Sequence, residues 1–154
     1  MTGGSPGEGW FALAEKVAET LDIGPGTRVF EVDCGSGDFL VPFYSNGYIV
    51  GGTDADPAAI VRALEAMPEG RFITAKASAL DPAMPWDAVI CRSLKGTTDL
   101  DHVRGLVARM FAKASHAIAL LDVPDTHHQP LLHALAEVGA KAIQIDGDDV
   151  FARV

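Results

Sequence analysis

The sequence predicts an α/β fold: a doubly wound, mostly parallel sheet of seven strands with helices on both faces and a C-terminal antiparallel hairpin. Three observations predict this fold. Short apolar runs typical of strands alternate with longer segments whose apolar residues recur at helical spacing. Residues 116–123 are apolar along their middle, as in a parallel strand covered on both faces. Near the end of the chain, Gly147 stands between two aspartates, which indicates a hairpin turn.

The first half of the chain shows clear starts and stops. The glycines and proline of residues 24–26 end the first helix, and Gly47 ends the second. Asp56 followed by Pro57 predicts a capped helix start, with proline in the first helical position. In order, we expect a helix over 10–23, a strand over 28–32, a helix over 38–47, a strand over 48–53 and a helix over 57–67.

The second half continues the same alternation. Residues 99–114 form an amphipathic pattern typical of a helix packed on a sheet. We expect strands over 71–75, 87–93 and 116–123, helices over 99–114 and 129–140, and a final antiparallel pair over 141–145 and 150–154. Parallel strands joined by helices require right-handed crossovers, so ligands are expected at the carboxyl ends of the strands.

Length and composition bound the class of protein. The 154 residues suit one ordinary domain, and 48% hydrophobic with 21% charged residues suits a globular core. The net charge of −9 argues against nucleic acid as a partner, and no apolar run is long enough to cross a membrane. We expect residues 1–9 to be a flexible segment without signal-peptide features, residues 10–154 to form a single domain, and a cytoplasmic location.

A glycine-rich stretch follows the first predicted strand. Gly35 permits a sharp turn, and Gly37 allows the backbone to approach a ligand closely. A dinucleotide fingerprint needs a third glycine where this chain has Leu40, and the Gly-Lys-Ser/Thr of a Walker phosphate loop is absent. A nicotinamide oxidoreductase is therefore disfavoured.

The run from Val29 through Leu64 resembles the class I S-adenosylmethionine (SAM)-dependent methyltransferase family. That family's first motif is an acidic residue followed by G-x-G-x-G, and here Glu31 precedes Asp33, Gly35 and Gly37 at the matching positions. An acidic residue ends the family's second strand, and Asp54 matches it. The resemblance implies SAM as the cofactor, with S-adenosylhomocysteine (SAH) as the product, and a ribose held by the Asp54 carboxylate.

The resemblance also implies a set of cofactor contacts, with two departures from the family pattern. Asp33 replaces the first glycine. Its carboxylate either pairs with the ammonium group of the cofactor or repels the cofactor's carboxylate, and the sequence leaves both open. Where the family carries an acidic residue for the adenine amine, this chain has Ala77, so Ser78 or Asp81 would have to accept that bond. The implied contacts are Glu31, Asp33, Cys34, Gly35, Gly37, Asp54, Ala55, Ala77, Ser78 and Cys91.

Catalytic residues are harder to predict. Past the fourth strand comes Arg92, without the aromatic residue or histidine that the family often has there. Past the fifth strand, Asp122, His127 and His128 are weak candidates for a general base. The alternative is that residues 125–126 cap the next helix, with the histidines in its solvated first turn. These three residues match no recognised metal-ligand spacing and the two cysteines are expected to be buried thiols, so no metal site is expected.

The sequence therefore predicts a SAM-dependent methyltransferase acting on a small molecule, with O-, N- and C-methylation all open. The alternative is a protein that keeps the fold but has lost methyl transfer, and serves as a cofactor-binding regulator or scaffold or catalyses a different reaction. The predicted connections are short, which leaves an acceptor site open to water. We therefore expect a homodimer or a partner protein to cover it.

Overall fold

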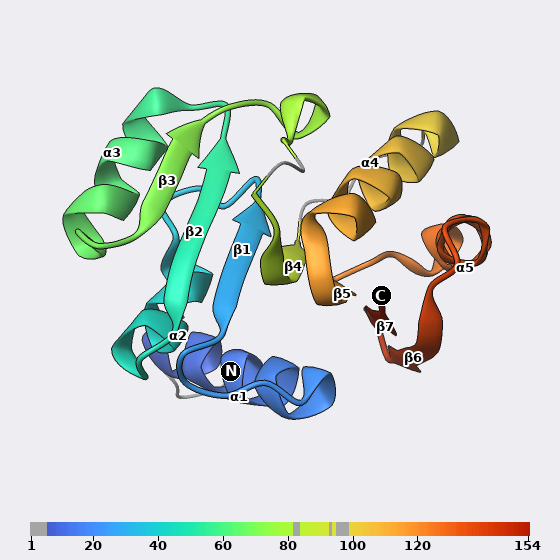
Figure 1. Ribbon diagram of the computed structural model, residues 1–154, viewed down its shortest axis with the longest axis horizontal. Helices are drawn as coiled ribbons and strands as arrows, with labels where there is room; N and C mark the ends of the chain where they lie inside the picture. The colour runs from blue at the N-terminus through green and yellow to red at the C-terminus, as the bar shows by residue number, and fades with distance from the viewer. Residues whose placement is uncertain (1–5, 82–83, 93, 95–98) are drawn as a thin grey trace.

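A seven-stranded sheet forms the centre of the molecule, in the order β3-β2-β1-β4-β5-β7-β6. The computed structural model describes residues 6–81, 84–92, 94 and 99–154. Figure 1 shows β1, β2 and β3 pointing the same way, and the last two strands form an antiparallel pair. The predicted fold class is confirmed. The strands are β1 Arg28–Val32, β2 Ile49–Asp54, β3 Arg71–Thr74, β4 Trp86–Cys91, β5 Ala114–Leu120, β6 Lys141–Asp146 and β7 Asp149–Arg153.

Helices cover both faces of this sheet. Among the described residues, no helix combines the length and the apolar character that a membrane crossing requires. The α-helices are α1 Pro6–Leu21, α2 Val41–Ser45, α3 Pro57–Ala66, α4 Leu100–Lys113 and α5 His128–Glu137, and the short 3-10 helices are η1 Asp38–Leu40, η2 Ala77–Ala79 and η3 Asp125–His127.

Some boundaries differ from those predicted. Helix α1 begins at Pro6 rather than at residue 10, and the expected flexibility of residues 1–5 lies outside the described residues. The single helix expected over 38–47 is divided into η1 and α2, because Pro42 has no N–H to continue the hydrogen-bond ladder. Strand β5 stops at Leu120, two positions before Asp122 takes a left-handed φ of 56°.

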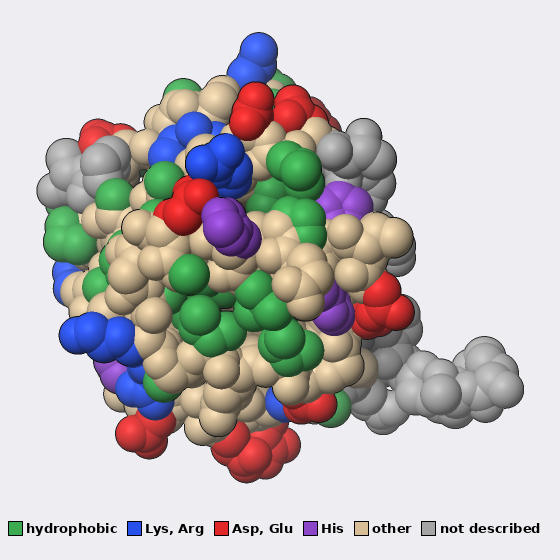
Figure 2. Space-filling view, turned by 90° about the vertical axis from the view of Figure 1, so that its right-hand side faces the viewer, with side chains coloured by type: hydrophobic (Ala, Val, Ile, Leu, Met, Phe, Trp, Pro, Cys, Tyr) green, Lys and Arg blue, Asp and Glu red, His purple; other side chains and the backbone are tan. Residues whose placement is uncertain are grey.

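Charged side chains of both signs are interspersed on the surface. On the face shown in Figure 2, acidic and basic side chains alternate around a hydrophobic patch. Between α4 and α5, Arg104 pairs with Glu137 at 3.1 Å. Exposed pairs of this kind contribute little to stability, so the fold depends on its core.

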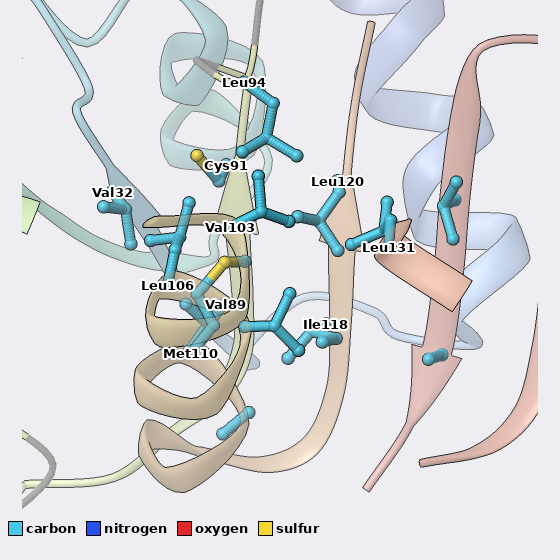
Figure 3. Packing of buried hydrophobic residues seen from close by; sticks show 14 of the residues in the cluster. Val32, Val89, Cys91, Leu94, Val103, Leu106, Met110, Ile118, Leu120 and Leu131 are labelled. Atoms are coloured by element: carbon cyan, nitrogen blue, oxygen red, sulfur yellow. The ribbon is translucent and has the colours of Figure 1, made fainter. Parts of the chain in front are cut away.

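Two hydrophobic clusters hold the layers together. One lies between the sheet and α4 and α5, and Figure 3 shows Leu106 and Met110 of α4 packed beside Val89 and Ile118 of neighbouring strands. The other lies between the sheet and α1, α2 and α3 and includes Phe39 and Phe43, both almost fully buried. Burial on both faces explains why β4 and β5 consist almost entirely of apolar residues.

The strand register brings three chain segments to one edge of the sheet. Val32 at the end of β1 pairs with Thr53 of β2 on one side and with Cys91 of β4 on the other. The residues that follow these strands therefore lie next to each other, although they are far apart in the sequence. Strand order reverses between β1 and β4, which is the point where ligands bind in open α/β sheets.

Candidate functional site at the carboxyl edge of the sheet

The glycine turn leaves the end of β1 through left-handed backbone positions. Asp33, Gly35 and Gly37 have φ angles of 55°, 58° and 80°. Aspartate adopts this region more readily than most side chains do, so the turn forms as expected despite the replaced glycine. A bond from Cys34 N to Thr53 O at 2.9 Å anchors the turn to β2.

Asp54 ties the glycine turn to the end of β2. Its Oδ2 accepts a hydrogen bond from Gly35 N at 2.9 Å, and its Oδ1 accepts one from Asp56 N at 2.9 Å. Asp56 caps α3 as predicted, its side chain accepting from Ala58 N at 3.0 Å. A carboxylate offers about four acceptor positions, so Asp54 retains capacity for a ligand hydroxyl.

A buried ion pair lies on the other side of β1. Glu31 is fully buried, and its Oε2 accepts a hydrogen bond from Arg92 Nε at 2.7 Å. Burial raises the pKa of Glu31 to about 7, Arg92 acts in the opposite direction, and the charges of Asp33 and Asp38 raise it further. Glu31 Oε1 is buried and has no hydrogen-bond partner among the described residues.

The Arg92 guanidinium lies over two aromatic rings. Its Cζ lies 4.6 Å from the centroid of Trp10 on α1 and 5.2 Å from that of Phe39 on η1. The two rings contact each other edge to face, with centroids 6.1 Å apart. Cation–π contacts of this kind add to the ion pair and fix the plane of the guanidinium.

The remaining predicted cofactor residues divide into two groups. Ala75 N bonds to Asp54 O at 2.9 Å, so the segment after β3 continues beside Asp54. In that segment Ala77 is buried and Ser78 is exposed, and Ala55 directly after Asp54 is also exposed. Cys91 is different: its side chain packs in the cluster under α4, away from the layer that contains Cys34.

Both cysteines are buried, as expected. Burial raises the pKa of the Cys34 thiol to about 12, and the charges of Glu31 and Asp54 act in the same direction. A protonated, buried thiol is a poor nucleophile. Cys34 therefore serves packing of the turn rather than chemistry.

The expected capping of the helix past β5 is wrong. Asp125 lies in η3, and neither η3 nor α5 has a side-chain cap. His127 is 7% exposed rather than solvated, with its Nδ1 at 3.1 Å from Thr126 Oγ1. A 3-10 turn after Pro124 forms in place of the cap, and it draws His127 inward.

The weak base candidates lie past β5, which is separated from β1 by β4. Asp122 is exposed, and its N–H donates to Asp149 Oδ1 at 2.9 Å. Ligand atoms of Asp125, His128 and Asp148 lie within 4.8 Å of one another. These residues differ from the base candidates Asp122, His127 and His128, and only His128 belongs to both sets. In the first set, two of the three side chains are exposed, and exposed carboxylates gather in this way without an ion, so the cluster alone does not define a metal site.

Arg92 is the site residue whose role the sequence does not reveal. It follows the fourth strand, and its pairing with Glu31 joins positions 61 residues apart. A strand-end arginine and a buried strand-end glutamate on neighbouring strands are the signal that would have found it. A separate groove of about 370 Å³ between α1 and α2, lined by residues such as Phe11 and Tyr48, lies at the amino ends of β1 and β2 and contributes nothing to this site.

Comparisons with solved structures identify the fold. Magnesium protoporphyrin IX methyltransferase (ChlM) from Synechocystis PCC 6803 with bound SAM has a TM-score of 0.78 at 17% identity, over 99% of this chain and 86% of that chain. Streptomyces venezuelae DesVI gives 0.79 at 12% identity, over 94% and 91%. The [4+2]-cyclase SpnF gives 0.70 at 16% identity, over 88% and 59%. No protein-family model and no curated protein matches the sequence. The chain has the fold of class I SAM-dependent methyltransferases.

Proposed function

We propose that this protein is a SAM-dependent methyltransferase that acts on a small molecule. The observation that supports it most is the arrangement around β1. Asp54 ends β2 beside a turn with open backbone, and Glu31 offers a buried oxygen that has no partner among the described residues. A cofactor with a ribose diol and an amino-acid tail that carries an ammonium group matches both carboxylates. The solved structures with bound SAM share this fold.

The residues present fit the cofactor. Asp54 would accept bonds from the ribose hydroxyls, and Glu31 Oε1 would accept one from the ammonium group of the tail. A Cβ added at Gly35 would meet no atom within 4 Å, so the space beside the turn is open to a ligand. When bound, SAM would supply a methyl group on a sulfonium: an acceptor atom in line would form a bond to the methyl carbon as the carbon–sulfur bond breaks, which leaves SAH as a thioether.

The chain's own contribution to the reaction is positioning. Holding donor and acceptor in line removes much of the entropic barrier, and a base is needed only when the acceptor must lose a proton. His127 is buried and bonded, and Asp122 and His128 lie past β5, so we assign none of them as the base. The proposal covers O-, N- and C-methylation.

The distribution of charge on the surface is consistent with a small-molecule acceptor rather than nucleic acid. The net charge is −9, and charges of both signs alternate on the face in Figure 2, whereas nucleic acid requires gathered Lys and Arg. Two neighbours of similar fold are named as methyltransferases of magnesium protoporphyrin IX and of an amino pentose. These names support the class of small-molecule acceptors and no particular substrate.

A second candidate is a protein that uses the same pocket without methyl transfer. SpnF has this fold and is named as a [4+2]-cyclase. Asp33 in place of a glycine and Ala77 in place of an acidic residue favour this alternative, because both alter contacts that the cofactor would make. The alternative keeps the fold and the pocket but not methyl transfer.

Isothermal titration calorimetry with SAM, SAH and NAD separates these functions. The proposed function predicts saturable binding of SAM and SAH at the carboxyl edge and none of NAD. SAM binding without formation of SAH in the presence of small-molecule acceptors would favour the second candidate. Binding of NAD alone, or of none of the three, would contradict the proposal.

A further inference from the structure

Arg92 contacts the one residue of the site that is fully buried and charged. Its Nε bonds to Glu31 Oε2 at 2.7 Å, and its guanidinium lies over the rings of Trp10 and Phe39. Trp10 belongs to α1, Phe39 to η1 and Arg92 to the end of β4. Two elements that are distant in the sequence thus meet the Arg92 guanidinium, which in turn binds the Glu31 carboxylate.

The geometry of the pair leaves one oxygen of Glu31 without a donor. Oε2 is taken by Arg92, and the buried Oε1 has no partner within the described part of the chain. A buried carboxylate oxygen without a hydrogen bond is costly, and native proteins keep such groups where a ligand, a water or a proton completes them. At the carboxyl edge of β1, a ligand is the completing group that the position suggests.

We propose that Arg92 is a positioning residue for the cofactor, which keeps Glu31 ionised through Oε2 so that Oε1 receives the ammonium group of the cofactor's amino-acid tail. This inference rests on the proposed function, since it needs a cofactor with such a tail. The two cations then share one carboxylate, each on its own oxygen. Arg92 touches Glu31 and not the reacting atoms, so its role is indirect.

The charges around Glu31 explain why an arginine is required. Burial and the carboxylates of Asp33 and Asp38 all favour the protonated form of Glu31, and the positive charge of Arg92 opposes them. The nearby Cys34 thiol is uncharged and adds no charge to this balance. Without Arg92, the remaining influences all push Glu31 toward the neutral acid near pH 7. A neutral carboxyl binds an ammonium group more weakly than a carboxylate does.

Trp10 and Phe39 keep the guanidinium in place. Arg92 has a planar, delocalised cation that stacks on rings, which the compact ammonium of lysine does less well. Arg92→Lys should therefore retain the charge with a looser geometry. Trp10→Ala should release the guanidinium from one side, whereas Trp10→Phe should retain a ring there.

The test measures SAH affinity as a function of pH by calorimetry. In the unmodified protein we expect the affinity to increase as the pH rises through about 7, where Glu31 ionises. In Arg92→Gln we expect this midpoint to move up by about one pH unit or more, and the affinity at neutral pH to fall about tenfold or more. Trp10→Ala should shift the midpoint in the same direction by less, and Trp10→Phe and Arg92→Lys less still.

Controls separate positioning from a merely structural effect. Glu31→Gln should bind SAH without this pH dependence, and adding Arg92→Gln to it should change nothing further. Arg104→Gln, which removes an arginine from an exposed pair on α4, should leave the pH profile unchanged. If Arg92→Gln does not fold, Trp10→Ala tests the same contact from α1.

An unshifted pH midpoint in folded Arg92→Gln or Trp10→Ala would overturn the inference, even if stability fell. That result would leave the proposed function standing, because the unmodified protein would still bind SAH. Absence of SAH binding by the unmodified protein at every pH would instead overturn the proposed function, and this inference with it.

Discussion

Asp54 is the residue on which the proposed ribose contact depends. We predict that Asp54→Ala weakens SAH binding by about 1.5–3 kcal/mol, the range for hydrogen bonds to a charged group. Because Asp54 also accepts from Gly35 N, part of this loss would come from a looser turn. Calorimetry on the variant gives the difference.

Asp56→Ala is the matched control for that measurement. Asp56 caps α3 from the same loop, and its loss should lower the free energy of unfolding by about 1 kcal/mol. We expect SAH affinity to be almost unchanged in this variant. Equal affinities for Asp54→Ala and the unmodified protein would mean that the ribose is bound elsewhere.

Glu31 predicts a pH dependence of stability. Its pKa is raised from 4.5 to about 7 in the folded protein, mainly by burial. Between these values the folded state keeps a proton that the unfolded state has released, so the free energy of unfolding falls as the pH rises. The loss is at most about 3.5 kcal/mol, because the pKa rises from 4.5 to about 7 and one pKa unit corresponds to about 1.4 kcal/mol.

Urea unfolding at about pH 5 and pH 7.5 checks this prediction. The unmodified protein should lose more stability across the interval than Glu31→Gln does, because glutamine does not titrate. All other groups are the same in the two proteins, so the comparison isolates the contribution of Glu31. Identical pH dependence in the two proteins would show that Glu31 is ionised throughout, contrary to its burial.

At the scale of elements, substitutions in the glycine turn should affect the free energy of unfolding and the affinity for SAH to different extents. Gly35 and Gly37 both have left-handed φ angles, but a Cβ at Gly37 would lie 2.6 Å from Met67 Cε, whereas one at Gly35 meets nothing within 4 Å. We predict that Gly37→Ala lowers the free energy of unfolding by about 2 kcal/mol and Gly35→Ala by about 1 kcal/mol. Thermal and urea unfolding measure both.

The same two variants should rank in the opposite order for binding. The Gly35 side of the turn faces open space, so a methyl group there would occupy room that the cofactor tail needs. We expect Gly35→Ala to weaken SAH binding more than Gly37→Ala does. The reverse order would place the ligand away from Gly35.

Much of this edge could be predicted from the sequence because each signal is local. Gly147 between aspartates predicted the β6–β7 hairpin, and Asp56 before Pro57 predicted the start of α3. The approach of Asp54 to the glycine turn followed from parallel strands ending at one edge. These features depend on a few neighbouring residues or on the strand order of the fold class.

The parts that sequence could not predict depend on longer-range packing. The Glu31–Arg92 pair joins residues 61 positions apart, and only the adjacency of β1 and β4 brings them together. Residues 125–126 form a 3-10 turn instead of the predicted helix cap. Both geometries suit these residue types, so composition does not decide between them. The burial of His127 follows from that turn.

At the scale of the whole molecule, the short connections between the elements lead us to expect association. The structure describes a single chain, and we expect a homodimer or a partner protein to cover the acceptor site. Sedimentation velocity of the active protein should show a dimer, or a monomer whose activity depends on an added partner. A monomer with full activity on its own would remove this expectation.

The central claim is that a nucleoside with an amino-acid tail lies across the ends of β1 and β2. A crystal structure of the protein with SAH tests it most directly. We predict that the ribose hydroxyls contact Asp54, that the ammonium group contacts Glu31 Oε1, and that Arg92 remains on Oε2. Density for SAH elsewhere, or an edge filled by the protein's own side chains in a saturated crystal, would contradict the account.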